Sequence, residues 1–203
     1  ITNMIGEERI HADRTTPESV DLHRLLKRMR DEGVDIVVME VSSHSLKLER
    51  VAGITYDVAA FTNLSQDHLD FHGDWDDYFA SKKLLFGMCA QAVVNCDDAF
   101  SMRMVEGQTY PVTGFGIREQ AYIMAHSIDI TPGGANFMLQ IGGQTLPVGL
   151  CIPGLFTVYN ALAAAGIAHV LGATGRSILM GLEKLKNVPG RFETLNTHGR
   201  DVT

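Results

Sequence analysis

The clearest pattern of apolar positions is helical and lies between residues 16 and 32. Four apolar side chains recur there at the three- and four-residue spacing of one helix face: Leu22, Leu25, Leu26 and Met29. Thr16 can cap the start of this helix, and Gly33 follows its basic last turn. The pattern therefore predicts an amphipathic helix over residues 16–32.

Three short runs beyond this helix are apolar at nearly every position. They are DIVVMEV at 35–41, DVAAFTN at 57–63 and AVVNC at 92–96. Such runs are typical of strands that are buried on both faces of a parallel sheet. Helices are predicted at 74–87, where acidic residues come first, and at 98–106. This alternation predicts the α/β class, with a doubly wound, mostly parallel sheet flanked by helices.

The pattern changes after about Gly107 to short runs in which apolar and polar positions alternate. Four such runs predict strands at 109–115, 121–130, 135–141 and 144–150. The residues PGG at 132–134 and GG at 142–143 predict hairpin turns, so we expect these strands to be antiparallel.

Helical periodicity returns after the alternating strands. An Ala-rich helix is predicted at 154–171 and a second helix at 175–186, and a further strand begins at Arg191. We expect residues 1–203 to belong to one domain. Its parts would be a parallel α/β core at 1–107 and 151–192 and a smaller antiparallel portion at 108–150.

Composition and charge exclude several classes of function. The 203 residues carry 17 basic and 24 acidic side chains, which gives a net charge of −7. This acidic balance argues against nucleic acid and against anionic membranes as partners. No apolar run is long enough to span a bilayer and no leader is visible, so we expect a cytoplasmic protein. Cys89, Cys96 and Cys151 form no CxxC pair and are predicted to be buried thiols.

Candidate metal ligands lie in the middle of the chain. Glu40 closes the apolar run at 35–41, and ligands bind at the carboxyl ends of strands in open α/β sheets. A simpler interpretation is that Glu40 caps the following turn. His68 lies in SQDHLDFHGD at 65–74, a segment with three carboxylates and two imidazoles. Such a donor set is compatible with Mg²⁺ or Mn²⁺, although a solvated acidic loop is the alternative.

Lys82 is the third candidate and lies at the end of the predicted acidic helix. The helix dipole alone explains Lys82 and its neighbour Lys83, because cations stabilise helix C-termini. A lysine near a partly buried cationic site can instead have a depressed pKa and act as a nucleophile. A neutral amine can also capture CO₂ and become a carbamate, which is an anionic metal ligand. The pattern of residues leaves these alternatives open.

Four segments resemble the central, ATP-binding domain of the Mur ligases. In chain order they are EVSSHSLKLERV, FTNLSQDHLDFHGDWDDYFASKKLLF, GLFTVYNALAA and VPGRFE. The resemblance covers about residues 1–192, and the pairing of EVSSH with TNLSxDHLDxHG is the specific part of it. Within the family the chain is most similar to ligases that add the third amino acid of the peptidoglycan stem.

The resemblance implies a ligand for each candidate site. Two Mg²⁺ ions would be held by Glu40, His68 and Lys82, the last as the carbamate N6-carboxylysine, and His68 and Lys82 would thereby be catalytic. The family's contacts to the UDP-linked peptide fall on four positions: Thr15, Thr16, Ser42 and Arg50. ATP contacts fall on Asn160 and Arg191; one polar residue on so apolar a helix costs stability unless it is satisfied, which favours a role for Asn160.

The reaction implied is ATP-dependent amide-bond formation through an acyl phosphate. The substrates would be UDP-MurNAc-L-Ala-D-Glu and either L-lysine or meso-diaminopimelate. The family's GxxGKT/S phosphate loop and its C-terminal domain do not occur in this sequence, so we expect the chain alone to be inactive. The alternatives are another Mur ligase, a ligase of the folylpolyglutamate synthetase kind, and a non-catalytic binding module.

Overall fold

The computed structural model describes residues 2–202 except for 66–68, 187, 189–194 and 198–199. The chain divides into two compact units, which are described separately below. The first unit contains residues 1–56 and 65–89, and the second contains residues 57–64 and 90–203. In the described part of the chain, no helix is long and apolar enough to cross a membrane.

The first unit combines one hairpin with four short or medium helices. Its elements are β1 (Thr2–Ile5), β2 (Glu8–His11), α1 (Ser19–Asp31), α2 (Ser43–Lys47), α3 (Leu69–His72), α4 (Trp75–Lys83) and the 3₁₀ helix Leu84–Gly87. β1 and β2 pair in antiparallel orientation. The predicted helix at 74–87 is thus confirmed, with its last four residues in the tighter 3₁₀ form.

The amphipathic helix α1 is confirmed, but it begins three residues later than predicted. Glu18 is the N-cap, with extended backbone angles and no side-chain hydrogen bond, so Thr16 does not cap this helix. Leu22 lies in a small apolar cluster with Leu46 of α2 and Val51 of the turn after it. The predicted apolar face of α1 therefore packs against α2 and the turn that follows it.

The predicted strand at 35–41 is wrong. These residues adopt no strand, and Ile36, Val37 and Val38 are 67%, 43% and 84% exposed. A strand that is buried on both faces needs a hydrogen-bonded neighbour, and among the described residues no strand pairs with this segment. Glu40 consequently lies in a loop that leads into α2 and does not lie at a strand end.

The second unit is built on a six-stranded sheet in the order β3-β4-β5-β6-β7-β8. Its strands are β3 (Ala59–Phe61), β4 (Ala92–Asn95), β5 (Val112–Gly116), β6 (Ile123–Thr131), β7 (Gly134–Ile141) and β8 (Gln144–Leu150). β3, β4, β5 and the start of β6 are parallel, whereas β6, β7 and β8 are antiparallel. The predicted mixed α/β sheet is confirmed.

One detail of the antiparallel prediction is wrong. β5 was expected to be antiparallel, but it pairs in parallel with β4 and with the first residues of β6. The two hairpins after β5 are as predicted. Gly142 and Gly143 form the loop from β7 to β8 with φ values of +56° and +74°, which a two-residue turn of this hand requires. Short-range turn signals thus fixed the hairpins but not the pairing of β5.

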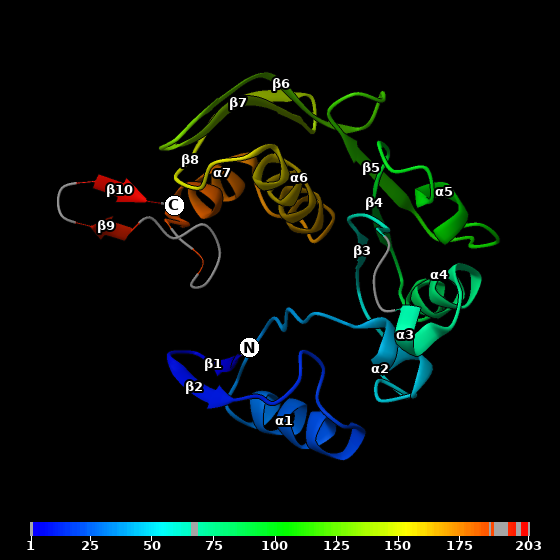
Figure 1. Ribbon diagram of the computed structural model, residues 1–203. Coiled ribbons are helices and arrows are strands. Elements are labelled where there is room, and N and C mark those ends of the chain that lie inside the picture. Colours follow the sequence, from blue (N-terminus) through cyan, green and yellow to red (C-terminus); the bar gives the residue numbers. More distant parts are fainter. Residues whose placement is uncertain (1, 66–68, 187, 189–194, 198–199, 203) are drawn as a thin grey trace. The chain divides into compact units, whose positions relative to one another are not determined.

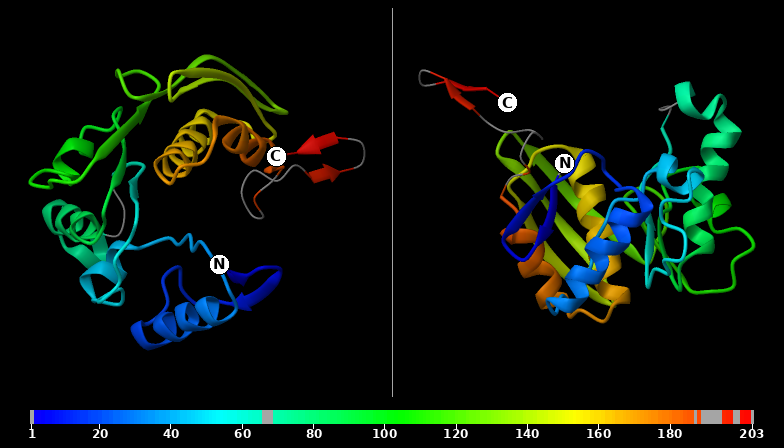
Figure 2. Two further views of the ribbon diagram at one scale, coloured as in Figure 1. Left: turned by 180° about the vertical axis from the view of Figure 1, so that it is seen from behind. Right: turned by 90° about the horizontal axis from the view of Figure 1, so that it is seen from below.

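The helices of the second unit pack mainly on one face of its sheet. α6 (Leu155–Val170) and α7 (Gly175–Lys184) lie on one face, and the short α5 (Ser101–Met104) lies on the other side of β4 (Figures 1 and 2). Buried residues of α6 such as Val158 and Leu162 form one core with Val93 and Phe115 of the sheet. This arrangement matches the predicted helices at 154–171 and 175–186.

Two remaining expectations concern the end of the chain and the cysteines. Arg191 lies outside the described residues; β9 (Leu195–Thr197) and β10 (Arg200–Val202) form a separate antiparallel pair. The cysteines are free, but Cys151 is exposed, so the expectation of three buried thiols is wrong for that residue.

Candidate functional site

Thr16 joins two motifs of the first unit that are distant in sequence. Its side chain is buried, with 1% of the residue exposed. The Thr16 hydroxyl donates to the Glu40 carbonyl oxygen at 2.8 Å and accepts from the Ser42 amide at 3.2 Å. A buried hydroxyl with both roles filled holds the backbone on either side of Val41 in one place. Thr16 thereby fixes the loop that carries two predicted site residues.

The polar side chains of the loop at residues 40–42 differ in their exposure and in their hydrogen bonds. The Glu40 side chain is exposed, and its carboxylate has no hydrogen bond or ion pair within the described part of the chain. Ser42 is half-buried and its Oγ accepts from the Ser45 amide at 3.1 Å, which caps α2. Thr15 is also half-buried. Glu40 is therefore available to a hard cation, for which carboxylate oxygens are the usual protein ligands.

Arg50 places a buried cation just beyond α2. Its side chain is 10% exposed, and Nε lies 3.2 Å from a Glu18 carboxylate oxygen. Nε makes no aligned hydrogen bond among the described residues, so this contact is an ion pair only. Glu18 also pairs with Arg14 at 2.6 Å. A guanidinium placed in this way can pair with a carboxylate, as its ion pair with Glu18 shows.

Lys82 lies in the last turn of α4, as the sequence indicated. Asp74 caps the start of this helix by accepting from the Asp77 amide at 2.8 Å. Lys82 is half-buried, and its Nζ lies 5.3 Å from the centre of the Tyr78 ring. His68 lies outside the described residues, and those described contain no cluster of three His, Cys, Asp or Glu side chains suited to a metal.

His72 is a buried polar residue that sequence reasoning did not single out. Its side chain is fully buried, with Nε2 2.8 Å from Ser43 Oγ and Nδ1 3.1 Å from Asp77 Oδ2. Ser81 Oγ lies 3.4 Å from Nδ1. The sequence signal was the pair of imidazoles in residues 65–74, which gives no hint of a partner as distant in the chain as Ser43.

A pocket of about 230 Å³ lies at the carboxyl ends of β3 and β4 in the second unit. It is lined by residues that follow these strands, by residues of α6 and by one arginine: Thr62, Asn63, Asn95, Asp97, Asp98, Phe156, Tyr159, Asn160 and Arg118. Asn160 is exposed there, so its amide can reach water and the argument from the stability cost of a polar residue on an apolar helix does not apply. Its place in the pocket is nevertheless suited to ligand contact.

Asp97 anchors this pocket and was also missed. The carboxylate is 1% exposed and accepts from the amides of Ile117, Arg118 and Glu119 at 2.7–3.1 Å and from the Tyr159 hydroxyl at 2.7 Å. Burial alone would raise the pKa of Asp97, but the Glu119 and Ile117 amides, the Tyr159 hydroxyl and the Arg118 amide together lower it. A charged Asp97 therefore ties the loop after β5 to α6.

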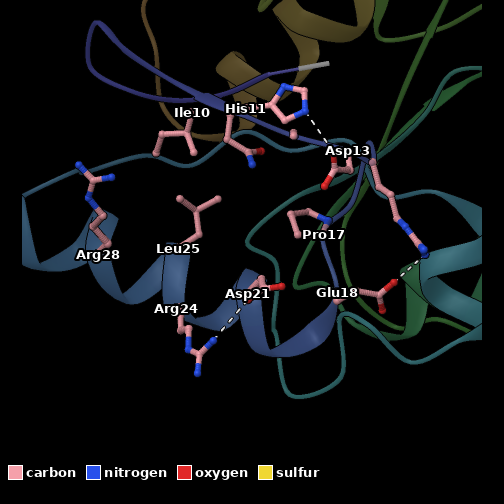
Figure 3. A pocket seen from close by; sticks show the side chains of 12 residues that line it. Ile10, His11, Asp13, Pro17, Glu18, Asp21, Arg24, Leu25 and Arg28 are labelled. Atoms are coloured by element: carbon pink, nitrogen blue, oxygen red, sulfur yellow. Dashed lines mark hydrogen bonds and ion pairs between the residues drawn. The ribbon is translucent and has the colours of Figure 1, made fainter.

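A larger pocket of about 420 Å³ lies between the hairpin and α1 in the first unit (Figure 3). Three arginines line it together with three acidic residues: Arg14, Arg24, Arg28, Asp13, Glu18 and Asp21. Most of these charges are paired, as in the contacts of Arg14 with Glu18 and of Arg24 with Asp21. The pocket is consequently near neutral and gives no sign of preferring an anion.

The second unit has the architecture of α/β enzymes that bind a ligand at the carboxyl ends of parallel strands. Sequence comparison gives the particular family. Residues 1–168 match the family described as "Mur ligase middle domain", and the chain belongs to the Mur ligase family.

Individual relatives agree with this assignment. A UDP-N-acetylmuramoyl-L-alanyl-D-glutamate–2,6-diaminopimelate ligase of Caldanaerobacter subterraneus is 48% identical over 99% of this chain and 42% of its own length. The enzyme of the same name from Clostridium tetani is 42% identical over 95% of this chain and 40% of its own length. A solved structure of such a ligase has a TM-score of 0.83 at 27% identity, over 90% of this chain and 39% of that one. The chain thus spans 39–42% of the length of these relatives.

Proposed function

We propose that this chain is the middle part of an ATP-dependent ligase that joins an amino acid to UDP-MurNAc-L-Ala-D-Glu. The observation that carries the proposal is the 48% identity, over 99% of the chain, to a relative named as a 2,6-diaminopimelate ligase. That name favours meso-diaminopimelate over L-lysine as the incoming amino acid. We also propose that the two units belong to one central domain and that the complete protein works in the cytoplasm.

The proposed reaction has two chemical steps. A carboxylate oxygen of the peptide attacks the γ-phosphorus of ATP, so that an acyl phosphate forms and ADP leaves. The amine of the amino acid then attacks the acyl carbon, an amide bond forms, and phosphate leaves with the carboxylate oxygen that made the first attack. The amine loses one proton in the second step. Catalysis of such a transfer rests mainly on positioning and on stabilising charge.

The peptide substrate is assigned to the loop that Thr16 holds. Thr15 and Ser42 are half-buried at this loop and can offer hydroxyl groups, while Thr16 keeps the loop in shape. Arg50 supplies a buried guanidinium that now faces the Glu18 carboxylate at 3.2 Å. A substrate carboxylate would take the place of Glu18, which is 54% exposed and free to turn into solvent.

The nucleotide is assigned to the pocket of the second unit. Asn160 lines it, and the neighbouring Tyr159 is fixed by its hydrogen bond to Asp97. The pocket lies at the carboxyl ends of the parallel strands β3 and β4, which is the usual place for a ligand in such sheets. Arg191 is proposed as a second ATP contact from the family resemblance alone.

Two Mg²⁺ ions are assigned to Glu40, His68 and carbamylated Lys82. The exposed carboxylate of Glu40, which has no competing partner among the described residues, fits this role. An unmodified lysine ammonium is no metal ligand, so Lys82 fits only as the carbamate. The ions would offset negative charge on the transferring phosphoryl group.

A substrate screen of the complete protein tests the proposal. We expect ADP release with ATP, meso-diaminopimelate and UDP-MurNAc-L-Ala-D-Glu, and none with the UDP-linked tripeptide or a folate in its place. Turnover with the tripeptide or the folate would support the related ligases, and no turnover with any substrate would support a binding module. The 203-residue chain is the matched control and is expected to be inactive.

A further inference from the structure

A closed ring of polar contacts joins three helices of the first unit. His72 at the end of α3 contacts Ser43 at the start of α2 and Asp77 in α4, at 2.8 and 3.1 Å. Lys47 at the end of α2 returns to the same Asp77 oxygen at 2.5 Å. Ser81 of α4 adds its hydroxyl, which donates to the Asp77 carbonyl and lies 3.4 Å from His72 Nδ1.

The contacts of the ring indicate which nitrogen of His72 donates to Asp77. A carboxylate can only accept, so Nδ1 must carry the proton that is donated to Asp77. In a neutral imidazole Nε2 is then an acceptor, and the Ser43 hydroxyl donates to it. The hydrogen bond from Lys47 is the largest cause of a lowered pKa of Asp77, burial opposes it, and His72 adds to the lowering. Asp77 therefore stays charged and keeps this tautomer in place.

The order serine, histidine, carboxylate is that of a hydrolytic triad, but the burial of these side chains excludes such a role. Ser43 is 3% exposed and His72 is 4% exposed, so neither can reach a substrate. A buried, fully hydrogen-bonded set of this kind orients the groups next to it. Those neighbours are Ser42 on one side and Lys82 on the other, each one residue away from a member of the ring.

We propose that His72 is a positioning residue for the ligase reaction. It holds the start of α2, which Ser42 caps, in a fixed position relative to α4, which carries Lys82. This inference rests on the proposed function, since Ser42 is assigned there to the peptide substrate and Lys82 to catalysis. The contact with Ser43 positions the neighbouring Ser42, which is assigned to the peptide substrate. The contact with Asp77 positions α4, which carries Lys82. The His72 side chain contacts both Ser43 and Asp77.

Two substitutions in the complete ligase separate the two contacts. In His72→Asn the amide nitrogen takes the place of Nδ1, so the Asp77 contact is kept and the Ser43 contact is lost. We expect KM for the UDP-linked peptide to rise about tenfold with kcat within about twofold, the size of one hydrogen bond. In His72→Gln the amide oxygen takes the place of Nε2 and accepts from the Ser43 hydroxyl, so the Ser43 contact is kept and the Asp77 contact is lost; we expect kcat to fall about tenfold with little change in KM.

Single-partner variants and a control complete the test. Ser43→Ala should reproduce the KM effect and Asp77→Asn the kcat effect. His23→Gln is the control, because His23 is exposed in the same unit and contacts only the Ala52 carbonyl at 3.1 Å among the described residues. Equal effects of both His72 variants on KM and kcat, in proportion to their loss of thermal stability, would show a structural role only and overturn the proposal. Unchanged kinetics would overturn it as well.

A second readout separates this inference from the proposed function. In ¹⁵N spectra of the complete protein, the His72 imidazole should carry its proton on Nδ1, and the signal is assigned by its loss in His72→Asn. A proton on Nε2 contradicts the ring whether or not the protein is a ligase. If the wild-type protein shows the predicted tautomer but makes no tripeptide, the proposed function fails, and with it the positioning role, while the ring itself stands.

Discussion

The amide of Ser42 donates to the hydroxyl of Thr16 at 3.2 Å across 26 positions of sequence. The same hydroxyl donates to the Glu40 carbonyl at 2.8 Å, so one buried side chain holds a loop that pairs with none of the described strands. The site proposed for the peptide substrate is thus built from two separate motifs and depends on a single hydroxyl group.

The first prediction removes this hydroxyl without changing the shape of the side chain. Thr16→Val leaves the Glu40 carbonyl and the Ser42 amide without their buried partner, which we expect to cost about 1–3 kcal/mol of unfolding free energy. KM for the UDP-linked peptide should rise in the complete ligase. Thr16→Ser keeps the hydroxyl and serves as the control. If the valine and serine variants had the same KM and stability, the proposed role of the hydroxyl would be wrong.

The second prediction concerns the carbamate at Lys82. Lys82→Ala should abolish ligase activity in the complete protein, and added formate or acetate should restore part of it by replacing the carboxylate oxygens. Lys82→Arg keeps a positive charge but cannot form this carbamate, so it should also be inactive. Lys83→Ala is the matched control from the same helix turn. Near-normal rates for Lys82→Ala would contradict the assignment.

The third prediction uses the lowered pKa of Asp97. Asp97→Asn removes the charge from a buried side chain that accepts several hydrogen bonds, and we expect a loss of about 2–3 kcal/mol at neutral pH. Because the folded pKa lies below the unfolded value of about 3.9, the stabilisation is complete above that pH and is lost as the pH falls through the folded pKa. The stability of wild type and variant should therefore converge in acid.

Chemical unfolding of the complete protein at neutral and acidic pH measures this convergence. Asp129→Asn serves as the control, since Asp129 is exposed on β6. A gap between wild type and Asp97→Asn that stays constant down to about pH 3 would mean that Asp97 is not the titrating group.

The fourth prediction tests the nucleotide pocket. Asn160→Ala should raise KM for ATP about tenfold, as expected for one lost hydrogen bond, and leave KM for the UDP-linked peptide nearly unchanged. Asn136→Ala is the control, because Asn136 is exposed on β7 and does not line this pocket. If Asn160→Ala raised only the KM for the UDP-linked peptide, the assignment of Asn160 to the ATP site would be wrong.

Local patterns predicted much of the fold. The stripe of α1 and the glycine turn at 142–143 depend on neighbours a few residues apart, so the sequence could specify them. The apolar run at 35–41 could not be interpreted in this way, because its burial depends on whether another strand lies beside it.

The candidate site was predictable only in part, for a similar reason. Family resemblance selects residues such as Glu40 and Lys82, whose chemistry is visible in the sequence. The roles of His72 and Asp97 each depend on a contact with a residue 20 or more positions away, Ser43 for His72 and Ile117 for Asp97. Spacing along the chain carries no signal for such contacts, and they became evident only from the folded structure.

The most direct test of the central claim follows one oxygen atom through the reaction. The complete protein is supplied with ATP, meso-diaminopimelate and UDP-MurNAc-L-Ala-D-Glu labelled with ¹⁸O in its reacting carboxylate. The acyl-phosphate route predicts that each released phosphate carries one ¹⁸O atom from the peptide and that the UDP-linked tripeptide forms in equal amount. Unlabelled phosphate, or ATP hydrolysis without tripeptide, would contradict the proposal that this chain is part of an amide-forming ligase.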